Sequence, residues 1–75
     1  MINYNYYEEA ILAFEKAIQI KPKSIEARLG LSKAYQAISQ PDKAELVLNE
    51  ALEIDPKKED IEDIYVALFD LYIYR

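Results

Sequence analysis

Apolar residues recur at spacings of three and four along most of the chain, which is the period of one face of a helix. The pattern is interrupted at Pro22 and Pro56, because a proline pushes the residue before it out of the helical region. It resumes at Pro41, which suits the first turn of a new helix. The pattern predicts helices over about residues 5–20, 24–38, 41–54 and 59–74. Short turns between them favour antiparallel helical hairpins, so the expected fold class is all-α.

The first and third predicted helices, with the turns that follow them, share one pattern. Residues 7–24 align without gaps on residues 41–58, at an offset of 34 positions. The identical pairs are Ala10/Ala44, Leu12/Leu46, Ala17/Ala51, Ile20/Ile54, Pro22/Pro56 and Lys23/Lys57. Small, apolar and proline positions thus recur in the same order, which indicates a helical repeat.

This repeat resembles the tetratricopeptide repeat, a unit of about 34 residues that forms two helices. The family signature is Trp-x-x-Leu-Gly-x-x-Tyr on the first helix, followed by Ala-x-x-x-Phe and a closing Pro on the second. The matching positions here are Leu31, Tyr35, Ala44, Leu48 (in place of Phe), Ala51 and Pro56. The chain departs from the signature at Arg28, which replaces Trp, and at Ser32, which replaces Gly. A serine still lets a neighbouring helix approach closely, so the packing of the family stays possible.

The resemblance implies an architecture and a class of function. One whole repeat covers residues 25–58, preceded by the second helix of one repeat and followed by the first helix of another. We therefore expect residues 1–75 to form one domain, a four-helix fragment of a right-handed superhelix. The family implies a non-catalytic interaction or scaffold module, with a protein or peptide as partner and no cofactor.

In this family the first helices of successive repeats line a groove that holds extended peptides or partner helices. The resemblance assigns to this groove Glu26, Leu29, Lys33, Gln36, Asp60 and Asp63, with Gly30, Ala37, Ala67 and Asp70 as further candidates. Lys33 is the only cation among these positions. The set therefore does not resemble the paired Lys, Asn and Arg with which one subgroup holds a C-terminal carboxylate.

The last predicted helix has an unusually wide apolar surface. Its apolar residues cover more than half of the circumference, which is more than one neighbouring helix can cover. Three interpretations stay open: this surface meets a following helix of a longer parent protein, is covered by another copy of the chain, or folds onto its own chain. The candidate residues for self-association are Ala10, Phe14, Ala17, Tyr65, Leu68, Phe69 and Tyr72.

The alignment of this last helix with the repeat is also open. At the offset of 34, residues 59–72 share no identity with residues 25–38. A shift of one residue would place Ala67 opposite Ala34. Both registers are therefore compatible with the sequence.

Composition excludes several classes of function. The chain has no cysteine, histidine or tryptophan and one glycine, which excludes imidazole catalysis, Cys/His metal sites and glycine-rich phosphate loops. We therefore expect no enzyme activity, no metal and no small-molecule substrate. A net charge of −5 disfavours nucleic acid and anionic membranes as partners. No secretory signal pattern opens the chain, so the cytoplasm is the expected location.

Negative charge is concentrated towards the C-terminal end. Residues 59–75 carry five acids and one base, which gives −4, whereas residues 1–58 carry nine acids and eight bases, which gives −1. An acidic surface favours a basic partner segment by steering and orienting it. Acids also suit the N-terminus of a helix, where the macrodipole favours negative charge, so both explanations stay open.

Overall fold

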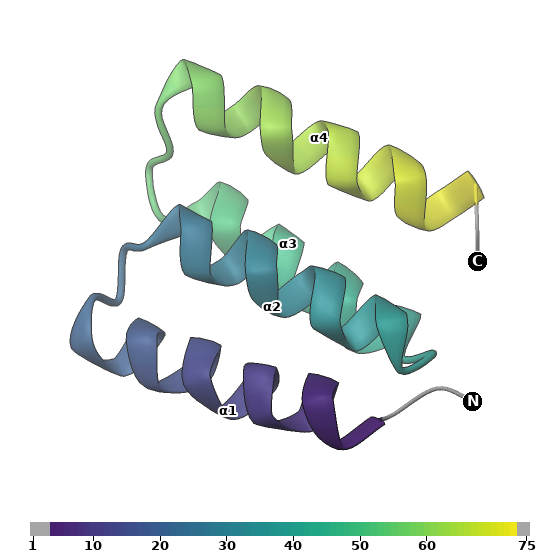
Figure 1. Cartoon of the computed structure of the whole chain (residues 1–75). Helices are drawn as coiled ribbons and strands as arrows, with labels where there is room; N and C mark the ends of the chain where they lie inside the picture. The colour runs from purple at the N-terminus through teal and green to yellow at the C-terminus, as the bar shows by residue number, and fades with distance from the viewer. Residues whose placement is uncertain (1–3, 74–75) are drawn as a thin grey trace.

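The computed structural model describes residues 4–73, which form four helices and no strand (Figure 1). The helices are α1 (Tyr4–Ile20), α2 (Ile25–Ala37), α3 (Pro41–Glu53) and α4 (Lys58–Ile73). Each bound lies within one residue of the position expected from the sequence, and the expected end at residue 74 falls outside the described residues. The all-α class predicted from the apolar pattern is confirmed.

Local sequence signals set the starts of α2 and α3. Ser24 is the N-cap of α2, and its Oγ accepts a hydrogen bond from the Ala27 amide at 3.2 Å. This bond satisfies one of the amides that a helix N-terminus leaves without an internal partner. Pro41 occupies the first turn of α3, where its missing N–H is not needed.

The C-terminal end of α2 is closed by a residue in the left-handed region. Ser39 has φ 61°, its amide bonds to the Gln36 carbonyl at 3.1 Å, and the Gln40 amide bonds to the Tyr35 carbonyl at 2.9 Å. These two bonds form a Schellman motif, in which the left-handed position is usually glycine. Asp55, after α3, also has a positive φ, of 59°. Both turns therefore use a residue with a side chain where glycine would relieve strain.

Each helix packs on the next, and α2 also packs on α4. Figure 1 shows α1 and α4 at opposite edges of the molecule, with α2 and α3 between them. Over the described residues, α1 and α4 do not pack on each other. The chain is thus a short stack of antiparallel hairpins with one open helix at each edge.

Two buried clusters hold this stack together. The larger one joins α2, α3 and α4, and consists of Ile25, Ala44, Leu48, Ala51, Ile64, Leu68 and Leu71. The smaller one joins α1, α2 and α3, and consists of Ile11, Leu31, Ala34 and Val47. Tyr35 packs against both clusters. Because α2 and α3 contribute to both, the central hairpin connects the two edges.

The structure shows which register of α4 applies. On α1, the ring of Phe14 lies so close to Gly30 of α2 that a Cβ at Gly30 would overlap it. At the offset of 34, the counterparts of Phe14 and Gly30 are Leu48 and Ile64, which share one buried cluster. A large residue against glycine is thus replaced by two residues of middle size. This packing supports the unshifted register.

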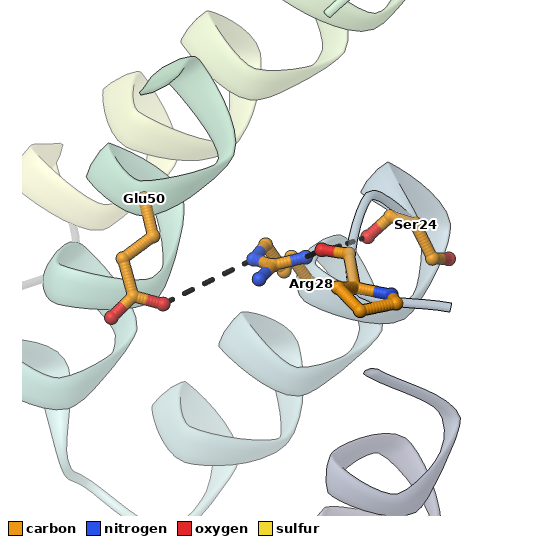
Figure 2. Close-up of polar contacts among 4 residues, drawn as sticks. Ser24, Arg28 and Glu50 are labelled. Atoms are coloured by element: carbon orange, nitrogen blue, oxygen red, sulfur yellow. Dashed lines mark hydrogen bonds and ion pairs between the residues drawn. The ribbon is translucent and has the colours of Figure 1, made fainter. Parts of the chain in front are cut away.

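Arg28 stands at the tryptophan position of the family signature and is almost completely buried. Its Nη1 donates to the carbonyl oxygens of Pro22, at 2.5 Å, and Ser24, at 3.3 Å. Its Nε lies 4.0 Å from Glu50 Oε2 on α3 and has no hydrogen-bond partner (Figure 2). Arg28 therefore connects the α1–α2 turn to the central hairpin mainly through backbone carbonyls.

We expect Ser39→Gly to stabilise the protein by about 0.5–1 kcal/mol, because glycine adopts positive φ without steric cost but loses more entropy on folding. Urea unfolding at equilibrium measures this difference. Ser39→Ala, which keeps the strain, serves as the control and should bring no gain. Equal effects of the two substitutions would contradict the strain at Ser39.

We expect Arg28→Ala to lower the free energy of unfolding by about 1–3 kcal/mol, because it removes two hydrogen bonds and the packing of a buried side chain. Glu50→Gln should cost less than about 0.5 kcal/mol, since the ion pair is long and the Glu50 side chain is 52% exposed. Urea denaturation of the two variants separates these contributions. A loss at Glu50 as large as that at Arg28 would show that the ion pair dominates.

Candidate functional site

The helices α2 and α4, each the first helix of a repeat, lie side by side (Figure 1). Residues of both helices line a hollow. The hollow has a volume of about 330 Å³ and is lined by Leu29, Lys33, Asp63, Val66, Ala67 and Asp70. We call these six residues the α2/α4 groove. It lies where the resemblance placed a binding groove.

The predicted groove residues are only partly brought together. Leu29, Lys33 and Asp63 line the α2/α4 groove. Glu26 and Asp60 line a different hollow, of about 750 Å³, formed by the α1–α2 turn and the N-terminal ends of α2 and α4. Gln36 lines neither hollow, and is half-buried near the end of α2.

Val66, Ala67 and Asp70 also line the groove, and of these only Val66 was not a candidate from the sequence. They follow Asp63 at spacings of three, four and seven, so they lie on the same face of α4. This periodicity is the signal that could have identified Val66 as well. The sequence did not identify Val66 as a groove residue, because its apolar character also fits the wide apolar surface of the helix.

The α2/α4 groove combines an apolar floor with charged edges. Leu29, Val66 and Ala67 supply the apolar atoms, Lys33 lines the α2 side, and Asp63 and Asp70 line the α4 side. Such a surface can hold apolar side chains and orient charged ones. Among the described residues, no cluster of three or more His, Cys, Asp or Glu side chains could hold a metal ion.

The residues predicted for self-association lie on both edges of the stack. On α4, Tyr65, Phe69 and Tyr72 are exposed. Leu68, by contrast, is buried in the chain's own core against α3, so it is not available to a second copy and the expectation for this residue is corrected.

On α1, the predicted residues Ala10, Phe14 and Ala17 are half-buried. Two of them, Ala10 and Phe14, line a hollow of about 290 Å³ together with Tyr6, Tyr7, Gly30, Lys33 and Ala34. We call these seven residues the α1/α2 hollow. It lies on the edge of the stack that no other described helix covers.

A further hollow, of about 460 Å³, includes residues of α1, α2 and α3. Tyr35 lies in it, and burial, with a smaller contribution from the charge of Glu15, raises the pKa of its phenol above the ordinary value. The Lys43 ammonium lies 5.7 Å from the centre of the Tyr35 ring, within the range of a cation–π contact. These interactions hold Tyr35 in the packing between the two clusters.

Comparison with known proteins supports the repeat. The sequence pattern of the family described as "Tetratricopeptide repeat" matches residues 5–73. Neither a curated protein nor a solved structure matched the chain. Within residues 4–73, no helix has both the length and the apolar character needed to cross a bilayer. Since the family pattern covers nearly the whole chain, including the groove and both open edges, the chain belongs to the tetratricopeptide repeat family.

Proposed function

We propose that this chain is a non-catalytic interaction module that binds a basic, extended segment of a partner protein in the α2/α4 groove. Tetratricopeptide repeats generally act as protein-interaction scaffolds, which supports the class of function. The observation that carries the choice of partner is the groove itself, with its apolar floor and two carboxylates.

The charge of the groove supports a basic partner rather than an acidic one. Asp63 and Asp70 line the groove, against one lysine, Lys33. The neighbouring hollow at its N-terminal end is lined by two acids and three lysines, so it adds no negative charge. A basic segment would be attracted by Asp63 and Asp70, whereas an acidic segment would be repelled. The apolar floor would receive alternate apolar side chains of an extended segment.

We expect a labelled peptide of alternating lysine and leucine to bind, and its counterpart with glutamate in place of lysine not to bind. Asp63→Asn together with Asp70→Asn should weaken the binding about tenfold, because two charge contacts of about 0.7 kcal/mol each are lost. Binding should also weaken as salt is added. Fluorescence polarisation measures all three effects.

The matched control is Glu9→Gln together with Glu53→Gln, which removes the same charge from exposed positions on α1 and α3. This pair should change binding less than twofold, since these side chains lie outside the groove. If both double variants weaken binding equally, the attraction comes from overall charge, and the proposed site is wrong. If neither peptide binds, the proposed partner class is wrong.

A further inference from the structure

The helix α4 presents an apolar face to solvent. Tyr65, Val66 and Phe69 are 58%, 60% and 63% exposed, and they follow one another at spacings of one and three. We call these three residues the α4 face. They lie on a different side of the helix from Ile64, Leu68 and Leu71, which are buried against α3. A patch of large apolar side chains on one side of a helix indicates an interaction surface.

The internal repeat shows what such a face packs on. At the offset of 34, the counterparts of Tyr65, Val66 and Phe69 are Leu31, Ser32 and Tyr35 on α2. Leu31 and Ser32 are buried, and Tyr35 packs against both clusters of the core. In α2, this face is covered because the chain continues into α3. The α4 face is therefore the surface on which a second helix of a repeat would pack.

At the opposite edge of the molecule, a face of α1 that would pack on a first helix is incompletely covered. On α3, Ala44, Leu48 and Ala51 are completely or almost completely buried between α2 and α4. Their counterparts on α1 are Ala10, Phe14 and Ala17, which are only half-buried because α2 alone covers them. The α1/α2 hollow marks the place that a preceding first helix would fill.

Charges on the two edges match as well. Within the chain, Arg28 on α2 pairs with Glu50 on α3. At the offset of 34, the counterpart of Arg28 is Glu62 on α4, and the counterpart of Glu50 is Lys16 on α1. Both signs are reversed, so the pair remains attractive.

A second pair of positions also gives opposite charges between two copies. Leu29 on α2 and Ala67 on α4 line the same groove. Their counterparts are Asp63 on α4 and Lys33 on α2, which would form another pair of opposite charges between two copies. At the N-terminal end of α4, Glu59 is the counterpart of the buried Ile25, so the apolar part of the contact is confined to the middle and C-terminal parts of the helix.

We infer that α4 of one copy packs on α1 of a second copy, in the arrangement that α2 and α3 adopt within the chain. The occupant of the α4 face is thus a second copy, whose α1 supplies the missing second helix and whose Lys16 pairs with Glu62. The contact is heterologous, so each added copy presents a new α4 face, and assembly continues unless a ring closes. This inference goes beyond the proposed function, since it concerns the edges of the stack, and it shares Val66, Asp63 and Lys33 with the α2/α4 groove.

Light scattering over a concentration series tests the contact. The wild-type chain should increase in mass beyond a dimer, whereas Val66→Asp and Phe69→Asp should stay monomeric. Leu46→Asp is the matched control, because Leu46 on α3 is 60% exposed, as is Val66, but lies outside both edges. A wild-type chain that stays monomeric up to submillimolar concentration, or a Leu46→Asp variant that is as dissociated as Val66→Asp, would overturn the inference.

A charge swap distinguishes this contact from a pairing of two α4 helices. Lys16→Glu and Glu62→Lys should each weaken self-association about threefold to tenfold, because each places like charges opposite one another. An equimolar mixture of the two variants should recover nearly wild-type association, since every contact between unlike copies again joins opposite charges. Circular dichroism should show unchanged helix content, because both side chains are exposed.

Two outcomes of the swap would overturn the inference. If Lys16→Glu has no effect while Phe69→Asp dissociates the assembly, α4 pairs with α4 and α1 takes no part. If both single variants weaken association but the mixture does not recover it, the two charges do not face each other. Neither residue lines the α2/α4 groove, so peptide binding by these variants would still report on the proposed function independently.

Discussion

The structure depends on one packing constraint, the small–large–small face of the second helices. On α3 this face consists of Ala44, Leu48 and Ala51, and it needs a first helix on each side. The alanines leave room for close approach of the α2 and α4 backbones, and Leu48 fills the space between them. Because both first helices rest on α3, the groove between α2 and α4 is a consequence of this face. The same face on α1 has only α2 to cover it.

The protein core restricts the total volume of its side chains more strictly than their identity. The helix α4 shares no identity with α2, yet it keeps the register of the repeat because Leu48 and Ile64 together replace Phe14 and Gly30. Arg28 follows the same principle at the position of the family tryptophan. Its long stem fills the space, and its guanidinium donates to two turn carbonyls, so a charged residue is accepted at a buried position.

The sequence was sufficient to predict the helices and their order, because prolines and the spacing of apolar residues are local signals. The sequence could not show which apolar residues of α4 are buried in the core and which are exposed to solvent. Leu68 and Phe69 are adjacent and both apolar, and only packing on α3 buries one and exposes the other. The candidate groove was predicted only in part, again because packing decides which residues meet. Leu29, Lys33 and Asp63 line the groove, whereas Gln36 does not.

The most direct test of the central constraint compares the same substitution on the two second helices. Ala51→Leu and Ala17→Leu change counterpart positions, one fully buried on α3 and one half-buried on α1. Urea unfolding, at a concentration where light scattering shows a monomer, gives the free energy of unfolding of each variant. We predict that Ala51→Leu loses about 1–3 kcal/mol more than Ala17→Leu, because only Ala51 is enclosed on both sides. Equal losses would contradict the account, since they would mean that α1 is as enclosed as α3.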